Sequence, residues 1–175
     1  MAAELHARIT TTLNEFLNGY VEAGTKSDAS LLSTVLSPTC TREVAPASFL
    51  TALGMPTDLA FTNKQYEAMF AKELPVSRPT GLESVINVVV DVISKTAAAT
   101  CVYMAEFGDG VKEKMQFAWF LELDDEGARI TKVLEFVDTM TAARYQKKVE
   151  ELLQAEKEGS TSKEGDVSML GKAMQ

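Results

Sequence analysis

The side chain best suited to acid–base chemistry is Glu135, which lies in an apolar stretch between Leu134 and Phe136. A carboxyl group inside an apolar cavity has a raised pKa, which suits it to exchange protons near neutral pH. The alternative is a strand glutamate on the solvent face. Alternation does not decide between the two, because Ile130, Leu134 and Phe136 compete for the inner face. Glu135 is therefore a candidate catalytic residue whose orientation is open.

Arg42 and Tyr103 are the other candidate catalytic residues. Arg42 could pair with Glu135 or hold the enolate or carboxylate of a ligand, and its alternative place is the surface. Tyr103 lies within a predicted strand and follows the inward pattern. It could donate a hydrogen bond to a substrate oxygen, or it could be an ordinary core tyrosine. We interpret Asp138 as the N-cap of the last helix.

The sequence lacks residues that several common chemistries need. Its one histidine, His6, falls at the start of the first predicted helix, so we expect no Ser-His-Asp triad, Cys-His pair or histidine zinc site. Residues 19–26 fail as a phosphate-binding loop, because they follow a helix and their Lys and Thr are in the wrong order. Cys40 and Cys101 are far apart and form no metal knuckle or disulfide framework, and we interpret Cys101 as a small buried residue. We expect neither a metal nor an organic cofactor.

The helices that must position these groups are concentrated in the first half of the chain. The first has an apolar stripe at helical spacing, which consists of Ile9, Leu13, Phe16, Leu17 and Tyr20. We expect Gly24 to end it, Ser27 or Asp28 to cap a short second helix, and Thr62-Asn63 to cap a third.

An apolar loop separates the second and third predicted helices. Residues 40–44 read as one short strand, and residues 45–61 read as a loop. The loop carries the apolar residues Phe49, Leu50, Leu53 and Met55. A loop with that much apolar surface is expected to fold over another part of the molecule.

The second half of the chain changes to a strand-like period. Residues 85–94, 96–107, 111–123 and 129–137 predict strands, with hairpin turns at 108–110 and 124–127. A last helix is predicted from residue 138 or 139 to residue 153, followed by a flexible polar tail over residues 154–175. The order predicts one α+β domain over residues 1–153, in which a curved antiparallel sheet packs on N-terminal helices.

Such a sheet needs one face covered, and the helices and the 45–61 loop could enclose an apolar pocket there. The candidates for lining and binding a substrate are Phe49, Tyr66, Met115, Phe117 and Trp119. For each of these residues an ordinary place in the core is the alternative.

The bulk composition restricts the partners. The net charge of −8 repels phosphate backbones and anionic lipid, so we expect no nucleic-acid partner and no membrane. The most apolar run, residues 85–93, is too short to span a bilayer, and the first residues do not read as a signal peptide. These features favour a cytoplasmic protein that binds a hydrophobic small molecule.

Four stretches resemble the SnoaL-like branch of the NTF2-like superfamily, especially fungal proteins of polyketide and meroterpenoid pathways. They are residues 40–48 (CTREVAPAS), 62–66 (TNKQY), 115–121 (MQFAWFL) and 130–138 (ITKVLEFVD). The resemblance covers roughly residues 5–153 and implies a conical α+β barrel around a cavity, with dimerisation through the outer sheet face. Its members include isomerases, cyclases, dehydratases, epoxide hydrolases and binding proteins. Arg42 stands where many relatives have a histidine, which argues against a histidine base.

Three functions follow as hypotheses. The first is a cofactor-independent isomerase or cyclase for a polyketide- or terpenoid-type intermediate of secondary metabolism, with Glu135 moving a proton and Arg42 or Tyr103 stabilising the oxyanion. The second is a non-catalytic binding protein or dimeric scaffold. The third is epoxide hydrolysis, which needs a second carboxylate that the sequence does not identify.

Overall fold

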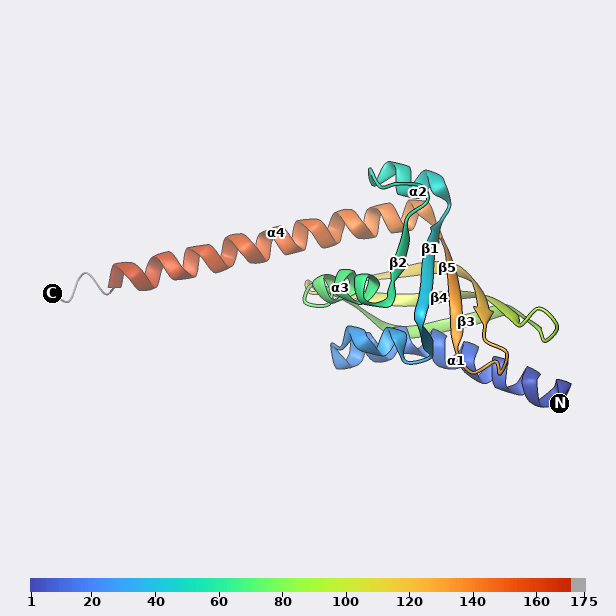
Figure 1. The fold of residues 1–175 in the computed structure, drawn as a ribbon. Coiled ribbons are helices and arrows are strands. Elements are labelled where there is room, and N and C mark those ends of the chain that lie inside the picture. Colours follow the sequence, from blue (N-terminus) through green and yellow to red (C-terminus); the bar gives the residue numbers. More distant parts are fainter. Residues whose placement is uncertain (171–175) are drawn as a thin grey trace.

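Four long strands from the second half of the chain build most of a curved sheet (Figure 1). The computed structural model describes the backbone of residues 1–170 and the side chains of residues 1–158. The strands are β3 (Ser77–Asp91), β4 (Thr96–Phe107), β5 (Lys112–Leu123) and β6 (Ile130–Val137). Each is antiparallel to the next, as their alternation and hairpin turns predict.

Two further strands complete the sheet on the β6 side. The strand β1 (Leu36–Ala45) pairs parallel with β6, and β2 (Ala60–Thr62) pairs antiparallel with β1. The sheet order is β2-β1-β6-β5-β4-β3, so β2 and β3 are edges and the predicted barrel stays open. The sequence predicts an antiparallel sheet, and this parallel pair corrects that prediction. The chain between β1 and β6 includes α3 and the strands β3–β5, and a connection of that length permits a parallel pair.

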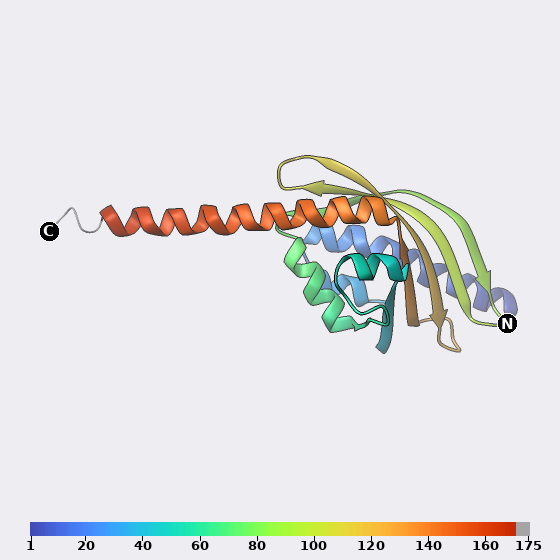
Figure 2. The same cartoon turned by 90° about the horizontal axis from the view of Figure 1, so that it is seen from above.

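Helices cover the concave face of this sheet (Figure 2). The helix α1 (Ala2–Lys26) packs along β3 and β4, and the one-turn helix η1 (Ala29–Ser33) follows it. The helix α3 (Asn63–Glu73) lies against η1, β1 and β2. The α1 stripe predicted from sequence is buried in the core, including Leu13, Leu17 and Tyr20.

The sequence predicts that Gly24 ends the first helix, but the structure shows that it does not. The helix continues to Lys26 and ends at Ser27, whose φ is 51°. A Cβ atom on Gly24 would lie 2.1 Å from the carbonyl oxygen of Pro79. The glycine is needed because α1 and β3 approach closely there, a role that a single sequence does not distinguish from helix termination.

The segment between β1 and α3 is more ordered than the predicted loop. It contains a short helix, α2 (Ala47–Ala52), in which Phe49 and Leu50 are buried. Thr62 caps α3 as expected, because its side chain accepts from the Gln65 backbone and the Gln65 side chain binds the Thr62 backbone. This capping box fixes the start of α3 and thereby the position of Tyr66.

The last helix, α4 (Thr139–Leu170), begins after Asp138 and extends away from the sheet (Figures 1 and 2). Asp138 accepts hydrogen bonds from the Met140 backbone and the Thr141 hydroxyl, which confirms its predicted capping role. The helix runs past residue 153, through residues 154–158, a Gln, Ala, Glu and Lys segment with high helix propensity. The flexibility of the tail stays a prediction, and its residues 171–175 lie outside the described residues.

None of the described helices combines the length and the apolar composition that crossing a membrane requires.

Candidate functional site

A cavity of about 250 Å³ lies between the inner face of the sheet and the helices α2, α3 and α4. Most of its wall is apolar, with side chains from α2, α3, β4 and β5. Its polar side chains are Tyr20, Tyr66, Glu73, Tyr103, Glu135, Tyr145 and Gln146. An apolar enclosure with a few polar groups is typical of small-molecule sites.

A buried hydrogen-bonded chain joins four elements at one end of this cavity. The Arg42 guanidinium donates to the Tyr20 hydroxyl, which lies 3.2 Å from the Tyr66 hydroxyl. The Tyr66 hydroxyl donates to Glu135 Oε2 at 3.0 Å. The side chains come from β1, α1, α3 and β6 respectively. Arg42 and Glu135 are only 3% and 8% exposed, so these hydrogen-bonded polar side chains are enclosed by the core.

The direction of the hydrogen bonds in this chain follows from the donors available. Each tyrosine hydroxyl has one proton to donate. Tyr66 uses its proton on Glu135, so Tyr20 must donate to Tyr66 and accept from Arg42. The two hydroxyls thus connect the guanidinium of Arg42 to the carboxylate of Glu135 through three hydrogen bonds that all donate in the same direction.

The charge of Arg42 is held close to Glu135 without a short ion pair. Arg42 Nη1 lies 3.8 Å from Glu135 Oε2, and its guanidinium carbon is 3.7 Å from the centroid of the Tyr66 ring. Burial raises the pKa of Glu135, while Arg42 and the Tyr66 hydrogen bond oppose that rise. Because the net direction is upward, Glu135 can accept or donate a proton closer to neutral pH than an exposed glutamate.

The orientation of Glu135 is settled by its neighbours in β6. Val133 and Val137 are buried together with Glu135, whereas Phe136 is 46% exposed on the other face. Glu135 therefore faces the cavity. Arg42 does not line the cavity, because its guanidinium lies behind the side chains of Tyr20 and Tyr66. In this arrangement Arg42 could position Glu135, and its predicted catalytic role stays a prediction.

Tyr103 lines the cavity, but its hydroxyl points to the helix α1. It donates to the Leu17 carbonyl oxygen at 2.7 Å and is 3% exposed. In this arrangement its proton holds α1 to β4. The role of Tyr103 as an oxyanion donor stays a prediction.

Four of the five residues expected to line the pocket do so, namely Phe49, Tyr66, Met115 and Phe117, each on the wall of the cavity. Trp119 does not. It lies behind Phe117, whose ring stacks on it at 5.3 Å, and its Nε1 donates to the Sγ of the buried Cys101 at 3.1 Å. Trp119 is part of the core that supports the cavity wall.

A second carboxylate, Glu73, lines the cavity at a different point. Its oxygens accept from the Tyr145 hydroxyl at 3.4 Å and from Gln146 Nε2 at 3.3 Å. Burial raises the pKa of Glu73, and the charge of Glu135 adds to the rise, while the two hydrogen bonds oppose it. Sequence reasoning missed Glu73, although it falls seven residues after Tyr66, which places both on one face of α3.

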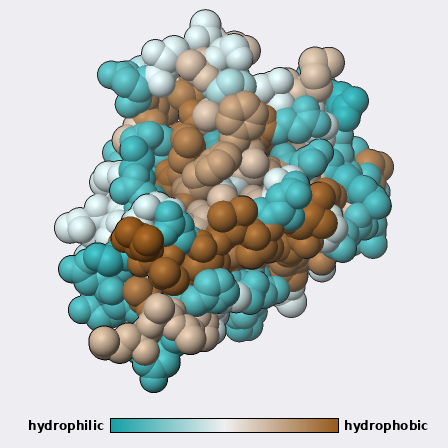
Figure 3. Space-filling view, turned by 90° about the vertical axis from the view of Figure 1, so that its right-hand side faces the viewer, coloured by the Kyte–Doolittle hydropathy of each residue, from teal (hydrophilic) through white to brown (hydrophobic). Residues whose placement is uncertain are grey.

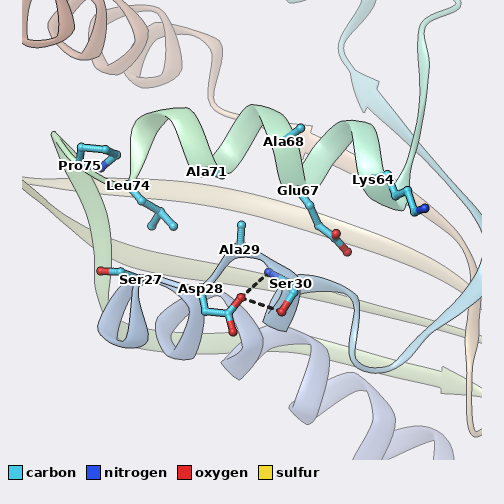
Figure 4. Close-up of a pocket in the computed structure, with 10 residues that line it drawn as sticks. All are labelled: Ser27, Asp28, Ala29, Ser30, Lys64, Glu67, Ala68, Ala71, Leu74 and Pro75. Atoms are coloured by element: carbon cyan, nitrogen blue, oxygen red, sulfur yellow. Dashed lines mark hydrogen bonds between the residues drawn. The ribbon is translucent and has the colours of Figure 1, made fainter.

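A shallow groove between η1 and α3 is a less suitable site (Figure 4). Much of its wall is made of small side chains, including Ala29, Ala68 and Ala71, with Lys64 and Glu67 at one end. Its Asp28 carboxylate accepts from the backbone and the hydroxyl of Ser30, which caps η1. Asp28 is thus used to fix the local backbone, and the exposed His6 is on α1, outside both hollows.

No group of three or more histidine, cysteine, aspartate or glutamate side chains suited to a metal ion occurs among the described residues. The expected absence of a cofactor stays a prediction.

The outer face of the sheet is unusually apolar. Two rows of paired residues cross β3, β4, β5 and β6, the first made of Val89, Ala98, Phe120 and Leu134 and the second of Ile86, Thr100, Ala118 and Phe136. Phe120 and Phe136 are 49% and 46% exposed. Figure 3 shows a band of apolar residues on this side of the molecule. Exposed apolar areas of this kind often mark interaction surfaces.

Comparisons with known proteins identify the fold. No protein-family model and no curated protein matches the sequence. The structure is similar to BvnE pinacolase from Penicillium brevicompactum, with a TM-score of 0.67 and 16% identity over 82% of this chain and 92% of that one. It is also similar to PrhC from Penicillium brasilianum, with a TM-score of 0.64 and 14% identity over 83% and 89% of the two chains.

A bacterial structure supplies the name of the fold. It is an NTF2-like protein of unknown function from Burkholderia pseudomallei, with a TM-score of 0.51 and 13% identity over 78% of this chain and 95% of that one. At these identities the likeness concerns the fold and not the activity. The open curved sheet, the covering helices and the cavity between them agree with this assignment, and the chain has the NTF2-like fold.

Proposed function

We infer that this protein is a cofactor-independent isomerase or cyclase that acts on an apolar intermediate of polyketide or terpenoid type in secondary metabolism. The observation that carries the proposal is Glu135, a buried carboxylate that faces an apolar cavity and has a raised pKa. The structural similarity to a fungal pinacolase supports an enzyme of this class.

The proposed reaction is a proton transfer next to a carbonyl group. The ionised carboxylate of Glu135 takes a proton from the carbon beside the carbonyl, and the electron pair of that C–H bond moves to the carbonyl oxygen as an enolate. The neutral Glu135 then returns the same proton to another carbon of the enolate system. Atoms and charge balance, because the product is an isomer of the substrate and the enzyme is regenerated.

The tyrosine chain suits the stabilisation of the enolate oxygen. In the resting state Tyr66 donates its hydroxyl proton to Glu135. When Glu135 becomes protonated it is a weaker acceptor, and the hydroxyl of Tyr66 can turn to the new oxyanion. Arg42, behind Tyr20 and Tyr66, keeps a positive charge near both oxygens throughout. The enolate charge thus replaces the carboxylate charge beside the same cation.

Turnover of a simple probe tests the role of Glu135. Cyclohex-3-en-1-one contains a ketone and a double bond that moves into conjugation by this proton transfer, and the product is followed by its ultraviolet absorbance. We expect the wild-type protein to accelerate the reaction and Glu135→Gln to lower the rate by about 10²–10⁴-fold. The matched control is Glu43→Gln, a strand glutamate that pairs with Lys132 in a solvent-exposed ion pair.

Equal turnover by the wild type and Glu135→Gln would remove the proposed role of Glu135. A cavity that binds such ketones without turning any over would instead indicate a binding protein, which is the second hypothesis from the sequence. Against that alternative, the cavity is not filled by Phe117 and Trp119, and polar side chains converge on it.

We also expect a homodimer through the outer sheet face. The rows on β3–β6 provide a surface on which Phe120 and Phe136 are the exposed aromatic residues. A second copy would cover this surface and remove apolar area from water.

A further inference from the structure

The polar groups of the cavity divide into two sets held by different parts of the fold. Glu135 is connected to the cation Arg42 by hydrogen bonds through Tyr20 and Tyr66. Glu73 receives only neutral donors, Tyr145 and Gln146 from α4. Both carboxylates line the same cavity. One set is thus neutralised by a buried cation, and the other is not.

The helix α3 sets the distance between the two sets. Tyr66, which binds Glu135, and Glu73 are seven residues apart on one helix. At about 1.5 Å of rise per residue this corresponds to about 10 Å along the axis. Met69 and Phe70 lie between them in α3 and line the cavity, and Met115 and Phe117 line it from β5. The two carboxylates are therefore reached from two positions of α3 about 10 Å apart along its axis, with apolar side chains between these positions.

Glu73 has unused capacity to accept hydrogen bonds. An ionised carboxylate has about four lone-pair sites, and Tyr145 and Gln146 occupy two of them. None of the ion pairs found among the described residues includes Glu73. Glu73 is half-buried, so water can reach part of its carboxylate, and the hydroxyl of a ligand in the cavity could replace that water as a donor.

We propose that Glu73, Tyr145 and Gln146 form a second subsite that binds a hydroxyl group of the substrate. The substrate class is then an elongated apolar molecule with a carbonyl at the Glu135 end and a hydroxyl at the Glu73 end, about 10 Å apart. This inference rests on the proposed function for the placement of the carbonyl, but the hydroxyl subsite is tested independently of turnover. Glu73 is in this account a specificity-determining residue.

Two ligands of nearly equal shape test the subsite. They are 4-(4-hydroxyphenyl)cyclohexanone and 4-(4-fluorophenyl)cyclohexanone, which differ only in whether the far end can donate a hydrogen bond. Their binding to the full chain is measured by calorimetry or by the fluorescence of the single tryptophan, Trp119, which lies behind the cavity wall. We expect the hydroxyl ligand to bind the wild-type protein about tenfold more tightly.

Variants then assign this preference to Glu73. In Glu73→Met the ratio of the two dissociation constants should fall to about one, since the acceptor is replaced by an apolar side chain of similar length. The matched control is Glu67→Gln, on the same helix but in the groove outside the cavity, which should keep the tenfold ratio. Glu135→Gln should also keep the ratio while it loses turnover of the cyclohexenone probe.

The outcomes separate the two proposals. Equal binding of the two ligands by the wild type overturns the subsite whether or not any variant folds, and so does a tenfold ratio that persists in Glu73→Met. Loss of the hydroxyl preference in Glu73→Met supports the subsite even if Glu135→Gln retains turnover, which would contradict only the proposed function.

Discussion

Each face of β5 and β6 carries side chains of the kind that a simple sheet would place on the opposite face. The inner face buries the charged Glu135 beside Arg42, and the outer face exposes Phe120 and Phe136. In a sheet with one solvent face, charges usually face water and aromatic residues face the core. We expect from these two exceptions that the inner face serves the proposed chemistry and the outer face the proposed dimer.

The inversion also explains why alternation leaves Glu135 undecided. Leu134 and Phe136 read as the apolar face of β6, yet Val133 and Val137 on the other side are the buried ones. Both faces of the strand contain apolar residues. Alternation therefore separates the residues of one face from those of the other, but it does not show which face is buried.

The largest difference between the faces is expected for two adjacent residues of β5. Trp119 is fully buried and Phe120 is 49% exposed on the opposite face. Trp119→Ala should lower the free energy of unfolding by about 4 kcal/mol, because it leaves a cavity in the core. Phe120→Ala should cost less than about 1 kcal/mol in the monomer. Urea unfolding at low protein concentration measures both, and similar costs would show that the faces do not differ in burial.

Removal of Arg42 should affect the inner face in a pH-dependent way. Arg42→Met leaves the buried Glu135 without a cation, and we expect a loss of about 3 kcal/mol in unfolding free energy at pH 8. Burial raises the folded-state pKa of Glu135, so its contribution is favourable below its ordinary pKa of 4.5 and is lost as pH rises through the folded-state pKa. The destabilisation should therefore be smaller at pH 5 than at pH 8.

The double variant Arg42→Met/Glu135→Gln, compared with Glu135→Gln alone, is the control for this prediction. Neither protein has the carboxyl group at position 135, so the loss caused by Arg42→Met in this background should not depend on pH between 5 and 8. A loss in Arg42→Met that is the same at both pH values would mean that Glu135 is not desolvated as the structure indicates.

The outer face is tested through the oligomeric state. Phe120→Lys places a charge at the centre of the apolar rows, once in each copy. We expect the dissociation constant of a dimer to rise about 100-fold, equivalent to about 2.7 kcal/mol for two buried charges. Analytical ultracentrifugation measures this shift. Glu122→Lys on the same strand, toward the edge of the patch, is the comparison, and equal effects of the two changes would argue against a centre at Phe120.

Much of the fold could be predicted from local patterns. The hairpin strands follow from alternation, and the caps at Thr62 and Asp138 follow from side chains that bind the adjacent backbone. The parallel pairing of β1 with β6 could not be predicted, because it joins segments separated by four strands. Local patterns contain no information on such a long-range pairing.

The candidate site was only partly predictable for the same reason. Arg42 and Glu135 could be proposed as a pair from their types and from the family resemblance. Tyr20 and Glu73 became part of the site only when α1 and α3 were placed against the sheet. In the sequence Tyr20 occupies one of the apolar positions of the first helix, and nothing in the sequence predicts that its hydroxyl contacts Arg42.

The most direct test of the account is the titration of the Glu135 carboxyl group. Carbon-13 NMR of labelled glutamate side chains follows it, with the signal assigned by its absence in Glu135→Gln. The account predicts a pKa above the ordinary value of 4.5 that changes when 4-(4-fluorophenyl)cyclohexanone enters the cavity. A pKa at or below 4.5 that is insensitive to this ligand would contradict the central claim that Glu135 is a desolvated base facing the binding cavity.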